Sequence, residues 1–216
     1  MFDTDKLNRL VEDLIDTMNH ANGAGIAAPQ IAEPWRVFVV HGTGKNPRYP
    51  YKPAVPLTVF VNPEIEVLDD YPMRIAEGCL SVPGMRGFVY RASKVRVRAR
   101  RPDGSHFSLL AEGHVAGTLQ HEQDHLDGRL FPDHSHLLMS AESFEEHYKD
   151  EFFEYAHSLN ERYPTPIVWE DETTTVDAGG SVAPATKRDV VVYAPELVWT
   201  GAGFVRNARI SVNTDT

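Results

Sequence analysis

Hydrophobic residues near the start of the chain recur at the three- and four-residue spacing of one helix face. They are Leu7, Leu10, Val11, Leu14, Ile15 and Met18, and Asn22-Gly23 follows them as a stop signal. This pattern predicts an amphipathic helix over residues 4–21. A second helix is predicted over residues 112–126, and a stripe of aromatic side chains predicts a third over residues 140–161.

Between these helices, alternation of apolar and polar residues and short β-branched runs predict strands. The predicted strands cover residues 37–40, 58–61, 64–68, 94–101 and 106–110. Pro102-Asp103-Gly104 predicts a hairpin turn between the last two. Helices and strands therefore occur in mixed order along the chain.

The composition changes after Tyr163, where acidic, threonine and glycine residues become frequent. Glu170-Asp171-Glu172 and Gly179-Gly180-Ser181 predict a flexible linker over residues 164–189. Residues 190–216 return to alternation and predict a short β-rich tail whose role the sequence does not indicate. We therefore expect one domain over residues 1–163, followed by the linker and the tail.

The overall composition is that of a globular protein and narrows its partners. The 216 residues are 42% hydrophobic and 24% charged, and the formal net charge is −10. An acidic protein repels phosphate backbones, so we expect no direct nucleic-acid binding. The single cysteine, Cys79, excludes an internal disulfide and is typical of a reducing cytosol. The sequence shows neither a membrane-spanning stretch nor a signal peptide, which predicts a cytoplasmic protein.

His121-Glu122-Gln123-Asp124-His125 is an HExxH motif inside the second predicted helix. Positions i and i+4 share a helix face, so both imidazoles can reach one metal ion while Glu122 lies beside them. A catalytic site of this kind needs a third ligand. Downstream histidines lack the spacing that HExxH proteases use, whereas upstream Glu77-Gly78-Cys79-Leu80-Ser81 contains the only cysteine. The sequence therefore predicts Cys79 as the third ligand.

Three separated motifs resemble the signatures of peptide deformylases. They are Gly23-Ala24-Gly25-Ile26-Ala27-Ala28-Pro29-Gln30, Glu77-Gly78-Cys79-Leu80-Ser81, and Gln120-His121-Glu122-Gln123-Asp124-His125-Leu126-Asp127-Gly128. The resemblance covers residues 1–135 and implies an α+β fold. In that fold, mixed or antiparallel β-sheets pack around a central helix that carries HExxH, with an N-terminal and a C-terminal helix. Family members begin earlier along the chain, so we expect a shortened N-terminal segment. Residues 164–216 have no counterpart in the family.

The resemblance implies a metal-dependent hydrolase that removes the formyl group from N-formylmethionine at the start of newly made polypeptides and releases formate. One divalent ion is implied, Fe(II) in the cell with Zn(II), Ni(II) or Co(II) as substitutes, and its implied ligands are Cys79, His121 and His125. Glu122 is the implied general base and acid. The implied oxyanion donors are the Gln30 amide and the backbone N–H of Leu80.

The same resemblance assigns roles around the metal. The residues implied to contact an extended peptide substrate are Ala24, Gly25, Gly78 and Arg86. Arg91 is placed to pair with Glu77 and to steady the segment that carries Cys79, and Asp124 to orient the ligands through an imidazole or a backbone group. For the glycines the alternative is ordinary turn chemistry, and for the arginines it is a solvated surface position.

Substrate selection and partners follow from departures from the family. Gly117 and Thr118 stand where members usually carry larger side chains in the methionine pocket, which predicts a wider and less selective pocket. Bacterial members dock on the ribosome through a basic C-terminal helix, but the helix predicted over residues 140–161 is acidic. The basic residues between Arg86 and Arg101 have two interpretations: they are the solvated face of a strand, or they make a transient contact with the ribosome. We expect a monomer without membrane contact.

Two other functions stay open at this point. The ligand set determines the chemistry but not the substrate, so one alternative is a deformylase-like hydrolase of another formyl or acyl amide. The other is a non-catalytic module that only holds a metal. Glu122 and Gln30 argue against this second alternative, because binding alone requires neither.

Overall fold

Two long antiparallel strands form the frame of the molecule. The computed structural model describes residues 4–170, in which β3 (Ala54–Cys79) pairs with β4 (Val82–Arg100) along most of its length. The sheet has the order β1-β2-β3-β4-β5-β7, and β6 also pairs with β4. Its shorter strands are β1 (Gly25–Ala27), β2 (Val37–Thr43), β5 (His106–Glu112), β6 (Leu137–Ser140) and β7 (Ile167–Glu170). Every pairing is antiparallel.

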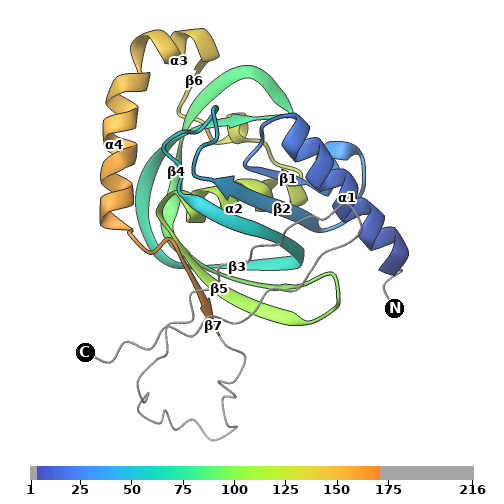
Figure 1. Ribbon diagram of the computed structural model, residues 1–216. Coiled ribbons are helices and arrows are strands. Elements are labelled where there is room, and N and C mark those ends of the chain that lie inside the picture. The colour runs from blue at the N-terminus through green and yellow to red at the C-terminus, as the bar shows by residue number, and fades with distance from the viewer. Residues whose placement is uncertain (1–3, 171–216) are drawn as a thin grey trace, which may run out of the picture.

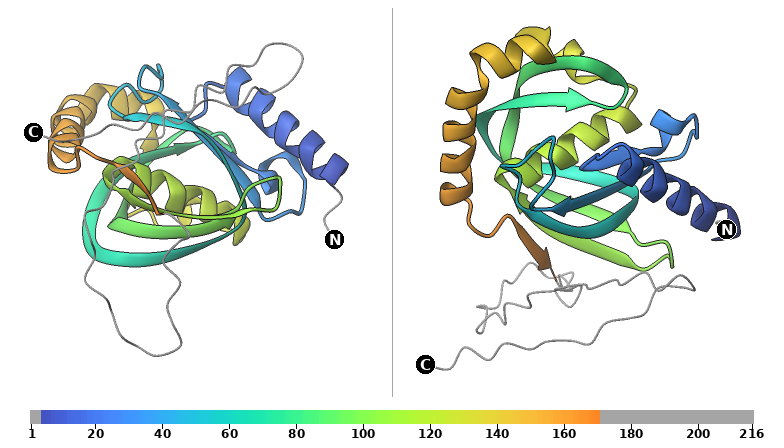
Figure 2. Two further views of the ribbon diagram at one scale, coloured as in Figure 1. Left: turned by 60° about the horizontal axis from the view of Figure 1, so that its bottom comes forward. Right: turned by 45° about the horizontal axis from the view of Figure 1, so that its top comes forward.

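The curved sheet wraps around the helix that carries the HExxH motif. The helices are α1 (Thr4–His20), α2 (Gly113–Leu126), α3 (Ala141–His147) and α4 (Lys149–Arg162), with short 3₁₀ turns at Ala28–Ile31 and Phe131–Asp133. Helix α2 lies inside the curve, with α1 on one side of the molecule and α3 and α4 on the other (Figures 1 and 2). The expected α+β fold around a central helix is thereby confirmed. Within residues 4–170, no helix is long and apolar enough to cross a membrane.

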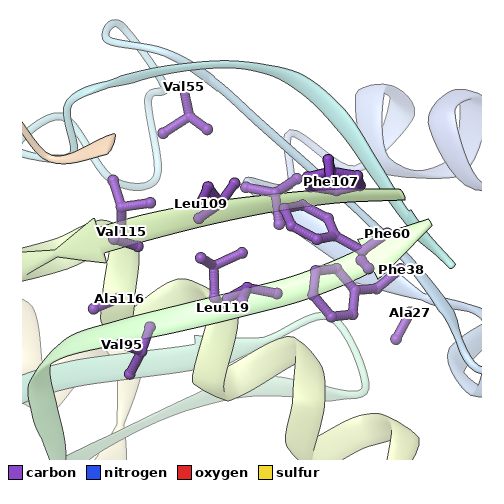
Figure 3. Packing of buried hydrophobic residues seen from close by; sticks show 14 residues of the cluster. Ala27, Phe38, Val55, Phe60, Val95, Phe107, Leu109, Val115, Ala116 and Leu119 are labelled. Atoms are coloured by element: carbon purple, nitrogen blue, oxygen red, sulfur yellow. The ribbon is translucent and has the colours of Figure 1, made fainter. Parts of the chain in front are cut away.

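A buried apolar cluster holds α2 against the sheet. Val115, Ala116 and Leu119 contribute one face of the helix, and the rings of Phe38 and Phe60 stack nearby with centroids 4.6 Å apart (Figure 3). Side chains of this cluster are almost entirely removed from water, so their burial fixes the position and rotation of α2. His121, Glu122 and His125 are thereby presented to β1 and to the end of β3.

The strands are longer than the sequence pattern predicts. The segments predicted separately at 58–61 and 64–68 are parts of the single strand β3, because a register shift between Val61 and Glu64 carries the chain past Asn62-Pro63. Asn62 adopts a left-handed conformation with φ of 49° at this irregularity. The strand predicted at 94–101 is likewise only the last part of β4 and runs one residue past its end.

The helix predicted over residues 140–161 is two helices with a break at Tyr148. The break lets the rings of Phe144, Tyr148 and Phe152 all approach Phe88 of β4, with centroid separations of 6.1, 5.8 and 5.9 Å. The aromatic spacing was therefore a sign of burial against one shared ring. It could not show that the helix axis changes direction.

The boundary predicted between the domain and the flexible linker, at residue 164, is placed too early in the chain. Residues 167–170 form β7, which pairs with β5 and extends the sheet by one strand. Trp169 packs on Phe107 with ring centroids 5.5 Å apart, and Glu170 accepts bonds from Arg96 and Ser108. These contacts hold residues 167–170 in the sheet, although the acidic and threonine-rich residues that follow predict a linker. The remainder of the predicted linker and the tail at 190–216 lie outside the described residues.

One histidine of α2 is enclosed without a charged partner. His114 is 2% exposed, and its Nε2 lies 3.0 Å from the carbonyl oxygen of Ala156 in α4, so we assign the ring proton to Nε2. Within the described part of the chain, Nδ1 has no hydrogen-bond partner. Burial lowers the pKa of His114 to about 4.

This histidine predicts a loss of stability in mild acid. Its folded pKa lies below the ordinary 6.5, so below that pH the unfolded chain binds a proton that the folded chain does not. We expect this one group to lower the free energy of unfolding by about 2 kcal/mol between pH 7 and pH 5. His114→Gln keeps a donor toward Ala156 but cannot titrate. Urea unfolding at both pH values should show a smaller loss in the variant, and equal losses would contradict the prediction.

Candidate metal centre

The predicted metal ligands come together at one end of the long hairpin. Cys79 is the last residue of β3, and the tight turn at Leu80-Ser81 leads into β4. This turn places the thiol over α2, where the donor atoms of Cys79, His121 and His125 all lie within 4.8 Å of one another. The Cys79 Sγ is 3.2 Å from the His125 Nε2. The three side chains thus surround one point.

The electrostatics of the cluster favour a thiolate. Burial raises the pKa of the Cys79 thiol, but hydrogen bonds from His121 and His125 outweigh it and lower the pKa to about 5. A thiolate with two imidazoles is a donor set suited to a divalent transition-metal ion. Three protein ligands also leave a position for a reacting molecule. These residues therefore fit a catalytic metal ion.

The carboxylate of Glu77 bonds one of the predicted ligands from behind. Its Oε2 lies 2.7 Å from the His121 Nδ1. Because Nδ1 donates this bond, the other ring nitrogen, Nε2, faces the cluster. The predicted pairing of Glu77 with Arg91 is present as two bonds, Nε to Oε1 at 2.7 Å and Nη2 to Oε2 at 3.0 Å. Burial opposes ionisation of Glu77, but His121 and Arg91 outweigh it and lower the pKa of this carboxyl.

Asp124 continues the buried network away from the cluster. It accepts a bond from Arg91 at 2.6 Å, and the imidazole that it contacts is His134, at 3.1 Å from Nε2. Arg129 pairs with its other oxygen at 3.1 Å. Sequence reasoning identified Arg91 and Asp124 but missed Arg129 and His134. Both follow α2 in irregular chain, where no periodic pattern marks them.

Glu122 lies beside the predicted metal ligands, and one of its carboxylate oxygens is unpaired within the described residues. The side chain is 3% exposed, and Oε2 has no hydrogen-bond partner among the described residues. Burial raises the pKa of Glu122, and the opposing effect of His121 and His125 does not cancel it. A methyl group on Gly25 would overlap this carboxylate, so the glycine lets β1 lie directly against Glu122.

Gln30 presents its amide nitrogen to the same space. In the 3₁₀ turn after β1, its Oε1 accepts a bond from the Ala27 N–H at 2.8 Å, which fixes the orientation of the amide. Nε2 then donates to the Ser81 hydroxyl at 3.1 Å and faces the Cys79 Sγ at 3.6 Å. The amide N–H groups therefore lie at the turn that also carries Leu80.

A cavity of about 530 Å³, counting the part open to solvent, adjoins the cluster. Cys79, His121 and Glu122 line one part of it, together with Ala24, Gly25 and Leu80. Gly117 and Thr118 line it as expected, but the space beside Gly117 is taken by the side chain of Ile75. The widening predicted from Gly117 is therefore smaller than the missing side chain suggests.

Other parts of the cavity wall were not predicted. They come from residues 47–56, which lie between the strands predicted at 37–40 and 58–61 and include no residue predicted for the site. Tyr49 donates to the carbonyl oxygen of Gly78 at 3.0 Å, and Lys52 donates to Thr118. The guanidinium of Arg86 lies over Gly78, where a methyl group would overlap it, and is 5.4 Å from the Tyr49 ring centroid. Tyrosines in a proline-rich loop were the available signal for this wall.

The curated proteins that this chain resembles are named as peptide deformylases. "Peptide deformylase 2" of Ralstonia nicotianae is 49% identical over 131 residues, which cover 61% of this chain and 73% of that protein. "Peptide deformylase 1" of Prochlorococcus marinus is 47% identical over 135 residues, covering 62% and 69%. These matches cover about three fifths of this chain.

Solved structures agree with these relatives. A class I type b peptide deformylase of Acinetobacter baumannii, bound to Met-Ala-Ser, has a TM-score of 0.59 and 40% identity, covering 62% of this chain and 83% of that one. The peptide deformylase of Thermotoga maritima has a TM-score of 0.55 and 31% identity, covering 63% and 86%. The family model for polypeptide deformylase matches residues 1–140. The chain therefore belongs to the polypeptide deformylase family of enzymes.

Proposed function

We propose that this protein hydrolyses the N-formyl group of the N-terminal formylmethionine of newly made polypeptides and releases formate. The observation that carries the proposal is the buried, partly unpaired carboxylate of Glu122 beside the Cys79, His121 and His125 cluster. Membership of the deformylase family supports the substrate. A relative bound to Met-Ala-Ser, a peptide with N-terminal methionine, supports it further.

We propose Cys79, His121 and His125 as the ligands of one divalent ion, Fe(II) in the cell, with Zn(II), Ni(II) or Co(II) able to replace it. When bound, such an ion supplies Lewis acidity toward a carbonyl oxygen and toward water. The thiolate favoured at Cys79 supports the softer ions of this group. The bond from His121 to Glu77 holds one imidazole ready for ligation.

Glu122 moves the proton in the proposed reaction. Its carboxylate takes a proton from the attacking water while the water oxygen bonds to the formyl carbon. It then gives that proton to the leaving nitrogen as the carbon–nitrogen bond breaks, which yields formate and a free amine. Its raised pKa suits a group that must both accept and return a proton near neutral pH.

Gln30 and Leu80 are the proposed donors to the oxyanion that develops on the formyl carbonyl. Gln30 lines the cavity, and its amide is held by Ala27 with the nitrogen directed to the Ser81 hydroxyl and the Cys79 thiol. Leu80 lines the same cavity, and its backbone N–H is the second proposed donor. Donors fixed before the reaction stabilise the transition state without reorganisation.

The peptide chain of the substrate is proposed to lie along β1. This strand is at the edge of the sheet, so an extended peptide can add to it near Ala24 and Gly25. Gly78 lines the cavity and the Arg86 guanidinium lies over it, so Arg86 is the proposed donor for carbonyl oxygens of the peptide. Glu77 is proposed to orient His121, and Arg91, which Asp124 holds in turn, is proposed to steady Glu77.

Gly25→Ala is predicted to impair the reaction. The added methyl group would overlap the Glu122 carboxylate and would push either that side chain or β1 away. Because small displacements of reacting groups are costly, we expect kcat/KM for formyl-Met-Ala to fall by about 10²-fold. In Gly23→Ala the nearest contacts, at 3.2–3.3 Å, are less severe, so this control should lose less activity. Equal activity of Gly25→Ala and wild type would contradict the packing argument.

A comparison of substrates distinguishes the proposed peptide deformylase from the two alternatives, a hydrolase of another amide and a non-catalytic metal-holding module. Formate or acetate release is measured anaerobically from formyl-Met-Ala, acetyl-Met-Ala and a small formamide, with the metal content determined on the same samples. The proposal expects selective turnover of the formyl peptide. Turnover only of another amide would indicate a deformylase-like hydrolase. A fully metallated protein without any turnover would indicate a metal-holding module.

We propose that the protein acts in the cytoplasm as a monomer and contacts the ribosome only transiently. Its thiolate-forming Cys79 supports a reducing compartment. On β4, Arg96 pairs with Glu170, and Arg98 pairs with Glu66, which leaves little uncompensated positive charge there. Weak co-sedimentation with ribosomes is expected, and it should decrease when Arg98 and Arg100 are changed to glutamate. Unchanged co-sedimentation would argue against a contact through β4.

A further inference from the structure

We infer that the cavity beside the metal centre accepts, besides methionine, substrate side chains of similar length that end in a hydrogen-bond-accepting oxygen, that it favours these over hydrocarbon ends, and that the Lys52 ammonium makes this selection. The inference rests on the proposed deformylation of N-terminal formyl peptides. It adds a specificity-determining residue to that reaction. Its basis is the position of Lys52, its contacts and the charges around it.

Lys52 reaches the cavity from the segment before β3. Its Nζ donates to the Thr118 hydroxyl at 2.9 Å and lies 4.6 Å from the centroid of the Tyr49 ring. Among the described residues, the ammonium contacts a neutral hydroxyl and an aromatic face. An ammonium has three N–H donors, so these contacts leave donor capacity for a group inside the cavity.

The position of Thr118 shows which part of a substrate would meet this ammonium. Thr118 precedes His121 by three residues on α2, which is about 5 Å along the helix axis. Residues three apart lie on one helix face, so Thr118 and the metal ligand line the same wall. With the formyl carbon held at the cluster, the first side chain of the peptide extends over this distance. An unbranched side chain of methionine length therefore ends near Lys52.

Three cationic side chains surround the ring of Tyr49, a residue of the cavity wall that Glu77 and Glu122 also line. The cationic groups of Arg48, Lys52 and Arg86 lie 5.5, 4.6 and 5.4 Å from the centroid of the Tyr49 ring. Burial lowers the pKa of Lys52 to about 8, against the opposing effect of Glu77 and Glu122, so the ammonium remains protonated at neutral pH. An acidic protein thus places three cations around one ring next to its proposed site.

The chemistry of the preferred side chain follows from these contacts. A hydrocarbon end would cover the ammonium without bonding it, whereas an oxygen acceptor would bond it directly. Glutamine, glutamate and methionine sulfoxide are unbranched side chains that provide such an oxygen. They share the recognised group and differ in charge, so a peptide series can separate a requirement for hydrogen bonding from one for negative charge.

The test uses the metallated full chain and formyl-X-Ala peptides in which X is norleucine, methionine, methionine sulfoxide, glutamine or glutamate. The readout is the ratio of kcat/KM for each oxygen-bearing peptide to kcat/KM for the norleucine peptide. In Lys52→Met this ratio should fall by about 10- to 100-fold for at least one oxygen-bearing peptide, the range expected for a hydrogen bond to a charged group. Lys45→Met, at an exposed position outside the cavity wall, should leave the ratio unchanged.

The norleucine peptide also reports whether each variant is folded, because misfolding lowers all rates together and leaves the ratio unaffected. Lys52→Gln keeps a neutral donor and should retain part of the preference. Wild type that cleaves the norleucine peptide, with an unchanged ratio in folded Lys52→Met, would overturn the inference and leave the proposed function standing. Wild type that cleaves none of the formyl peptides would overturn the proposed function itself.

Discussion

Glu122→Gln should lower kcat/KM for formyl-Met-Ala by about 10²- to 10⁴-fold, the range attributed to a general acid or base. Glutamine has nearly the same shape, so it can fill the buried site against Gly25 without a new overlap. It cannot accept the proton of the attacking water. Most of the loss should appear in kcat, because the group acts on the reacting atoms and does not bind the peptide.

Two further measurements make this prediction specific. The metal content of Glu122→Gln should equal that of wild type, because the proposed ligands Cys79, His121 and His125 are unchanged. The exposed Glu145→Gln on α3 serves as a control for loss of one carboxylate and should have wild-type activity. Retention of wild-type kcat/KM by a fully metallated Glu122→Gln would mean that another group transfers the proton.

Arg91→Met should lower the free energy of unfolding by about 3–5 kcal/mol, the usual effect of removing one partner from a buried ion pair. The guanidinium is 8% exposed and bonds both Glu77 and Asp124. Methionine fills much of the same space, but it would leave two carboxylates in a poorly solvated interior. The loss therefore reflects unpaired charge more than lost packing.

An exposed pair on the neighbouring part of β4 provides the control. Arg98 pairs with Glu66 at 3.0 Å, with its side chain 55% exposed, and removal of such a pair changes stability by about 0–1 kcal/mol. Urea unfolding of wild type, Arg91→Met and Arg98→Met measures both effects. Equal losses in the two variants would contradict the importance assigned to burial. Arg91→Met should also bind metal about 10- to 100-fold more weakly, because Glu77 no longer holds His121 firmly.

Local pattern was sufficient to predict the centre of the site. The HExxH spacing places His121 and His125 on one helix face whatever surrounds the helix, and the structure has that helix over residues 113–126. Cys79 was predicted because its motif is specific. Its approach to α2 depends on the whole β3–β4 hairpin, which the residue pattern did not predict.

Other parts of the site depend on contacts between distant segments. Lys52 and Thr118 meet only because the loop before β3 folds over α2, and His134 meets Asp124 only after the chain turns back at Phe131–Asp133. No spacing rule joins such residues. The sequence does not predict strand β7 for a similar reason. This strand is held by the contact between Trp169 and Phe107, two residues far apart in the chain, and the composition around residue 170 gives no sign of it.

Deformylation by this protein is proposed to require one metal ion held by Cys79, His121 and His125. Chelator-treated protein is titrated anaerobically with Fe(II) while formate release from formyl-Met-Ala and bound iron are both measured. Formate release should rise in proportion to bound iron and reach its maximum at one ion per chain, and Cys79→Ala should show neither tight binding nor activity. Full loading of wild type with iron and no formate release would contradict the claim.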